Sequence, residues 1–117
     1  MPNLQNISPI LPVADLEAEI KFFERLGFQK VYNSLQYSSE LDYVVLSRDG
    51  QTVHLQLFGE HDFYGQQVKI WVNDLDAIGE ELDEKIIPYN RRNNTPWNTS
   101  EIGMYSPARH AIYFVEE

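Results

Sequence analysis

The chain contains no cysteine in its 117 residues. Disulfide bonds, a thiol nucleophile and the thiolate ligands of a structural zinc site are therefore excluded, and any chemistry must use oxygen, nitrogen or aromatic groups. No apolar run approaches the roughly 18 residues that a membrane-spanning helix needs. The N-terminal stretch also lacks the basic start and unbroken apolar segment of a signal peptide. These absences predict a cytoplasmic protein that has no membrane partner.

Basic residues are scarce, with nine lysines and arginines against 18 acidic residues and a net charge of −9. Because nucleic-acid binding depends on cations that contact phosphates, this balance predicts no nucleic-acid partner. A negative field of this size favours the approach of cationic ligands. The sequence has no glycine-rich phosphate loop, HExxH helix or Gly-x-Ser-x-Gly elbow, so it offers no familiar catalytic motif.

A short repeat organises the chain, because VADLEA at residues 13–18 returns as VNDLDA at residues 72–77, 59 positions later. Each copy follows a stretch of extended character, and each has an aspartate, Asp15 or Asp74, where a helix N-cap belongs. Apolar residues at helical spacing follow both aspartates. The repeat therefore predicts helices near 15–26 and 74–85, the first of them closed by Gly27.

Alternating apolar residues and turn signals predict three further strands after each helix. The predicted strands cover residues 7–13, 28–34, 41–47 and 51–58, and then 68–72, 85–89, 100–105 and 110–116. This order predicts an α+β fold of two tandem βαβββ modules, 1–59 and 66–117, within one domain, 1–117. We expect the modules to form a curved eight-stranded sheet with a concave ligand cleft, because each sheet leaves one face uncovered by its helix.

Four motifs resemble the vicinal oxygen chelate superfamily, which includes glyoxalase I, the bleomycin resistance proteins and the extradiol dioxygenases. They are LPVADL at 11–16, FFERLGF at 22–28, VNDLD at 72–76 and the pair Pro96-Trp97. The resemblance covers nearly the whole chain and implies paired βαβββ modules. The last hairpin departs from the family pattern, since Ser106-Pro107-Ala108-Arg109 lacks the usual glycine.

The resemblance also implies where a divalent metal would bind. The superfamily's four ligand positions fall here on Ser8, His54, Gln67 and Tyr113. Stable metal sites of this kind want two or three histidine or carboxylate donors, so we expect neither a metal nor a cofactor. If a metal binds at all, His54 and Gln67 are its ligands, with Gln56 as a further donor one pleat from His54.

The bleomycin resistance proteins are the superfamily members that this residue set resembles most, and Trp97 matches a tryptophan that they carry ahead of the same hairpin. The resemblance implies an antibiotic-resistance type of binding protein that sequesters a small cationic or aromatic ligand, such as a bleomycin-type drug. Strand alternation and the loops predict the ligand-binding residues. They are His54, Gln56, Phe58, Gln67, Lys69, Trp71, Trp97 and Tyr113, with Phe63 and Tyr64 in a loop at the rim.

Two other functions stay open at this point. The chain could be a metal-dependent lyase, isomerase or dioxygenase with an atypical ligand set, in which His54 acts in catalysis as a general base. It could also be an accessory domain that only mediates assembly, which predicts a filled cleft. In either case an open curved sheet exposes strand edges and apolar rims, so we expect a homodimer in which each cleft is completed by the partner.

Overall fold

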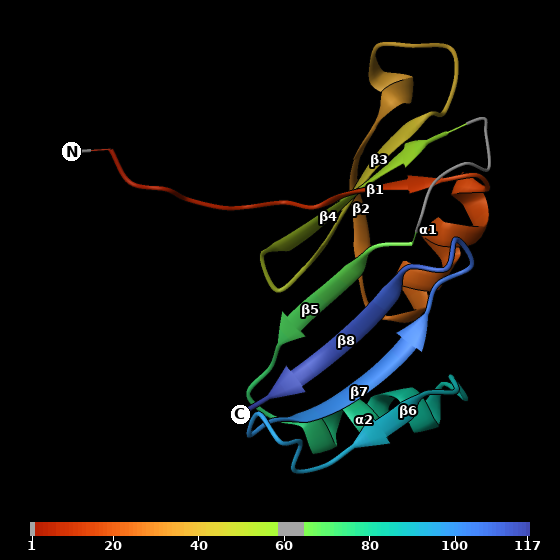
Figure 1. Ribbon diagram of the computed structural model, residues 1–117. Helices are drawn as coiled ribbons and strands as arrows, with labels where there is room; N and C mark the ends of the chain where they lie inside the picture. Colours follow the sequence, from red (N-terminus) through yellow and green to blue (C-terminus); the bar gives the residue numbers. More distant parts are fainter. Residues whose placement is uncertain (1, 59–64) are drawn as a thin grey trace. The chain divides into compact units, whose positions relative to one another are not determined.

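The computed structural model describes residues 2–58 and 65–117, and it divides the chain into two compact units, Met1–Phe63 and Tyr64–Glu117 (Figure 1). Phe63 and Tyr64, the predicted rim residues, lie outside the described residues. Neither helix of the described chain has the length and apolar content needed to cross a membrane.

The first unit is a four-stranded sheet with one helix. Its elements are β1 (Ile10–Val13), α1 (Leu16–Arg25), β2 (Gln29–Asn33), the short 3₁₀ helix η1 (Ser34–Gln36), β3 (Tyr43–Arg48) and β4 (Gln51–Leu57). The strand order is β1-β4-β3-β2, and β1 runs parallel to β4. The other pairs are antiparallel.

The second unit repeats this plan (Figure 1). Its elements are β5 (Gln67–Trp71), α2 (Leu75–Glu84), β6 (Asn90–Arg92), β7 (Ser100–Tyr105) and β8 (Ala111–Glu116). The strand order is β5-β8-β7-β6, with β5 parallel to β8. The predicted α+β fold of two βαβββ modules is therefore confirmed. The continuous eight-stranded sheet with its concave cleft stays a prediction.

The 59-residue shift holds at the level of strand register. Ile10 pairs with His54 across β1 and β4, and the positions 59 residues later, Lys69 and Tyr113, pair across β5 and β8. The hairpins differ by one residue, since two residues join β3 to β4 whereas three separate the bonded pair Ser106 and His110. The repeat is thus structural. The shift is 58 between β3 and β7, as the pairs Val44–Leu55 and Ile102–Phe114 show, and the extra residue of the last turn restores 59 in β8.

The helix ends explain why the repeat can be seen in the sequence. Asp15 accepts a hydrogen bond from the Ala18 N–H at 3.1 Å, and Asp74 accepts one from the Ala77 N–H at 3.0 Å. Each cap satisfies an amide that the first turn of the helix leaves without a partner. The helices then end at Gly27 and at its counterpart 59 residues later, Ile86, both with left-handed backbones at φ +87° and +57°.

The left-handed residue at the end of α2 is a testable weakness. A β-branched residue in this conformation is strained by roughly 1–2 kcal/mol, and the Ile86 side chain is exposed, so little packing offsets that strain. We expect Ile86→Gly to raise the free energy of unfolding by about 1 kcal/mol in urea denaturation. Gly27→Ala should lower it, since the same conformation there already has its glycine. Equal destabilisation by both changes would contradict this reading of the helix ends.

One predicted strand is wrong. Residues 85–89 do not form a strand, and β6 begins at Asn90 instead. The first residues of this stretch, up to Ile87, belong to the C-terminal cap of α2, because the Ile87 N–H donates a hydrogen bond to the Leu82 carbonyl at 2.9 Å. Pro88, which has no N–H to donate, follows at once. The apolar pair at 86–87 looked like strand but belongs to the end of the helix.

Each helix covers one face of its own sheet. In the first unit, helix α1 buries Leu16, Ile20 and Phe23, which recur at helical spacing. The strand that α1 contacts most is β4, whose alternating residues Val53 and Leu55 are also buried. In the second unit a methyl group added at Gly79 of α2 would lie 3.5 Å from the Ile102 side chain of β7. The cores therefore lie between helix and sheet, and each helix leaves the opposite face of its own sheet uncovered.

Candidate functional site

The open face of the second sheet is defined by strand alternation. Ile102 points toward α2, so its neighbours Glu101 and Gly103 point to the opposite face. The strand register then places the open-face residues in three cross-strand rows. The rows are Gln67, Ala111 and Tyr105; Lys69, Tyr113, Gly103 and Asn90; and Trp71, Val115, Glu101 and Arg92.

A pocket of about 400 Å³ lies on this face. It is lined by Gln67, Lys69, Asn90, Arg92, Trp97, Glu101, Gly103, Met104, Tyr105, Ala111 and Tyr113. Its volume falls within the range of small-molecule sites, roughly 300–1,000 Å³. Two small residues in the middle of the sheet make the space, Gly103 and Ala111. A methyl group added at Gly103 would lie 2.9 Å from the Tyr113 ring, so the ring occupies the place where another side chain would stand.

Trp97 is held at this pocket by a tightly bonded loop. The side chains of Thr95 and Thr99 are both buried and bond each other at 2.8 Å, and the Thr95 N–H donates to the Thr99 carbonyl at 2.7 Å. Asn94 and Asn98 adopt left-handed backbones, a conformation that asparagine tolerates better than most residues. The loop is thus fixed by its own bonds, and half of the Trp97 side chain stays exposed.

A buried carboxylate, that of Glu101, holds the Trp97 indole in place. Glu101 is 6% exposed, and its Oε2 accepts hydrogen bonds from Trp97 Nε1 at 3.0 Å and from Thr99 Oγ1 at 3.3 Å. Glu101, Gly103 and Arg92 were not among the residues predicted from the sequence. Alternation along 100–105 was the signal that could have found the first two, because Ile102 and Met104 mark the core face of that strand.

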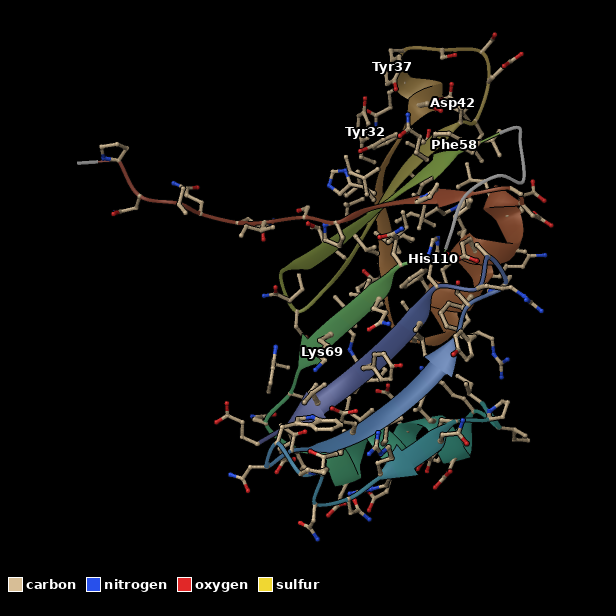
Figure 2. All side chains as sticks on the ribbon, viewed as in Figure 1. Tyr32, Tyr37, Asp42, Phe58, Lys69 and His110 are labelled. Atoms are coloured by element: carbon tan, nitrogen blue, oxygen red, sulfur yellow. The ribbon has the colours of Figure 1, made fainter. Side chains whose placement is uncertain are left out.

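Two cations border the pocket. The Arg92 guanidinium lies over the Trp97 ring, 5.1 Å from its centroid, a cation–π arrangement. Lys69 lies on the same face of the sheet, on β5, the strand at the opposite edge (Figure 2). The neighbouring Arg91 faces the helix instead, where it bonds Asp76 at 2.7 Å. Strand β6 therefore directs one arginine toward the pocket and one toward α2.

Four of the predicted ligand-binding residues come together at this pocket: Gln67, Lys69, Trp97 and Tyr113. Trp71 shares their face by alternation but is not part of the pocket lining, and its side chain is 58% exposed. The other three predicted residues, His54, Gln56 and Phe58, belong to the first unit.

In the first unit His54 is oriented by a tyrosine. Tyr43 Oη and His54 Nδ1 lie 2.7 Å apart, and the two rings meet edge to face at 5.6 Å. Burial raises the pKa of the Tyr43 phenol, so it stays protonated near neutral pH and can donate to Nδ1. Gln56 pairs with Tyr43 across the strands, and Phe58 follows β4 half-exposed (Figure 2).

The residues at the four implied metal positions fit a metal poorly. Ser8 Oγ is hydrogen-bonded to Thr52 Oγ1, and the Nδ1 of His54 is engaged by Tyr43. Gln67 and Tyr113 both line the pocket of the second unit, but an amide and a phenol are weak partners for a divalent cation. Within residues 2–58 and 65–117, no three histidine, aspartate or glutamate side chains gather as a metal site would require.

His110 has a structural role. Its side chain is fully buried, and Nδ1 accepts a hydrogen bond from the Gln66 N–H at 2.8 Å. The backbone N–H of His110 donates to Ser106 Oγ at 3.1 Å. The imidazole therefore fastens the start of β5 to the last hairpin (Figure 2).

Comparison with solved structures identifies the fold. A bleomycin resistance determinant encoded on the transposon Tn5 matches with a TM-score of 0.80 at 14% identity, covering 97% of this chain and 98% of that one. A bleomycin-binding protein complexed with bleomycin matches at 0.75 and 15%, covering 97% and 99%. Lactoylglutathione lyase from Agrobacterium tumefaciens matches at 0.77 and 15%, covering 99% and 96%. No protein-family model and no curated protein matches the sequence.

These matches are low in identity and define the class of fold. The chain shares its paired βαβββ fold with these solved structures, as its sequence motifs predicted. Both binding proteins and glyoxalase-type enzymes share that fold. The choice between these functions therefore depends on the residues of the site.

Proposed function

We propose that this chain is a binding protein of the bleomycin-resistance type, which sequesters a small cationic or aromatic organic ligand without a metal. The observation that carries the proposal is the pocket on the second sheet, with Trp97 fixed at its edge and Tyr113 inside it. Aromatic faces held in place bind planar rings at little cost in conformational entropy. The open pocket also disfavours a domain that serves only assembly, for which we expected a filled face.

The alternative is a metal-dependent lyase, isomerase or dioxygenase in which His54 and Gln67 act as ligands. The fold shared with a lactoylglutathione lyase supports it. The residues at the implied positions argue against it, because Ser8 and Tyr113 stand where the enzymes carry ligands. A reaction of that kind needs a cation held by several strong donors.

Tryptophan fluorescence separates the two functions. We expect bleomycin, or one of a panel of planar drugs, to quench the protein at micromolar concentration, with the same affinity before and after EDTA. Trp71→Phe should leave the quenching in place, whereas Trp97→Ala should abolish it, since Trp97 lines the pocket. Loss of the signal on chelation would favour the enzyme. Absence of quenching by every compound at high micromolar concentration would remove the main support for drug binding.

We also propose that the protein acts as a homodimer in the cytoplasm. Support for the dimer comes from exposed apolar side chains on the strands of the first unit, among them Ile10, Val31 and Leu57. Such residues on sheet edges and open faces commonly mark interfaces. Sedimentation velocity at micromolar concentration should show a dimer, and Val31→Lys should weaken it if β2 is part of the contact. A single monomer species in the unmodified protein would contradict this proposal.

A further inference from the structure

The pocket of the second unit is richer in cations than the rest of the chain. It contains Lys69 and Arg92 with one carboxylate, Glu101, whereas the whole sequence has twice as many acids as bases. In the described parts of the chain, neither Lys69 nor Arg92 forms an ion pair. Arg91, one residue from Arg92, does pair with an acid. The cations at the pocket are thus available to a ligand.

The single carboxylate is already committed to the protein. Glu101 Oε2 accepts from Trp97 and from Thr99, and these bonds fix the indole. Hydrogen bonds to a carboxylate disperse part of its charge, so Glu101 attracts an incoming cation less than a free carboxylate would. Two unpaired positive charges and one bonded negative charge leave the pocket with a positive balance.

We propose that this pocket selects an aromatic ligand that carries a carboxylate, with the ring against Tyr113 and Trp97 and the carboxylate on Arg92. This inference rests on the proposed binding function, and of the two kinds of ligand proposed there it keeps the aromatic one and drops the cationic one. A guanidinium stacked on an indole is held in position and can meet a carboxylate with two parallel hydrogen bonds. Lys69 stands on the opposite outer strand, about 14 Å away by three strand spacings, so Arg92 is the cation that contacts the carboxylate.

The net charge of −9 opposes this selection only weakly at physiological salt. Charges more than about 8 Å apart in solvent are largely screened at 0.15 M, whereas a carboxylate in contact with Arg92 is not. The local charge therefore decides which ligand stays bound, and the global charge mainly affects how fast ligands of each sign arrive.

Three ligands with the same ring and different charge test the inference: 2-naphthoate, 2-naphthalenemethanol and 2-naphthylmethylamine. Titrations followed by calorimetry, with the Trp97 indole N–H monitored by NMR, give each affinity. We expect naphthoate to bind about 10-fold more tightly than the alcohol, as a charge-assisted hydrogen bond predicts, and the amine to bind most weakly.

Matched variants on one strand locate the effect. Arg92→Gln should weaken naphthoate about 10-fold and leave the alcohol unchanged. Arg91→Gln makes the same change in net charge on the opposite face of β6 and should leave all three affinities unchanged. If the amine binds as tightly as naphthoate, or if both variants act alike, the charge selection is wrong while the binding function stands. If none of the three ligands binds at millimolar concentration, both proposals fail for this pocket.

Discussion

Gly103→Leu is expected to weaken binding of an aromatic ligand to the second unit by at least about 100-fold, which corresponds to roughly 2.7 kcal/mol. Gly103 lies in the middle row of the open face, and even a methyl group there would come within 2.9 Å of the Tyr113 ring. A leucine must displace that ring into the pocket and fill the space that remains. The backbone of Gly103 is not left-handed, so the substitution acts through volume and not through backbone strain.

The matched control is the glycine on the other side of the same sheet. A methyl group at Gly79 of α2 would make only ordinary contacts, the nearest at 3.4 Å, and alanine is the better helix former by about 1 kcal/mol. We therefore expect Gly79→Ala to keep full ligand affinity and to gain stability. Calorimetric titration of both variants provides the measurement. Undiminished binding to a folded Gly103→Leu protein would show that the ligand sits elsewhere.

His110→Ala is expected to lower the free energy of unfolding by about 2–4 kcal/mol, the largest stability effect that we foresee. The substitution removes a buried ring and leaves a cavity, and it strands the Gln66 N–H that the imidazole satisfies. Because the backbone carbonyl of Gln66 also accepts a hydrogen bond from the Ala111 N–H at 2.8 Å, the pairing of β5 with β8 should loosen at this end. Hydrogen exchange at the first residues of β5 should quicken accordingly.

Urea denaturation supplies the test, with Tyr105→Ala as its control. Tyr105 is close in sequence but 71% exposed, and substitutions of exposed residues usually stay within about 0.5 kcal/mol. A loss of less than 1 kcal/mol in His110→Ala, or equal losses in the two variants, would mean that the imidazole does not hold this junction.

The fold could be predicted from the sequence because specific residues mark where the helix of each repeat begins. Asp15 and Asp74 cap the helices, and alternating apolar residues set the strands that follow. The failure at 85–89 has a physical cause, since Ile86 takes a left-handed backbone that sequence patterns assign to glycine or asparagine. An isoleucine pair before a proline predicts an edge strand, and only the helix cap overrides it.

Only part of the candidate site could be predicted from the sequence. Gln67, Lys69, Trp97 and Tyr113 do line one pocket, since alternation places Gln67 and Lys69 on one face of β5 and Tyr113 pairs with Lys69. Alternation along 100–105 could have placed Glu101 on the open face, but its contact with Trp97, like that of Arg92, follows from no spacing along the chain. Gly103 was missed for the opposite reason, since its contribution is the absence of a side chain. The structural role of His110 was not predicted, since it comes from the bond between its imidazole and the Gln66 N–H, which are 44 residues apart in the chain.

The most direct test of binding without metal at the second sheet is an NMR titration of the chelator-treated protein with 2-naphthoate. We predict saturable shifts that centre on the Trp97 indole N–H and the amides of Gly103 and Tyr113, with small changes at Val44 and Leu55 in the core of the first unit. Shifts that appear only after a divalent metal is restored, or that centre on His54 and leave Trp97 and Gly103 unmoved, would contradict it.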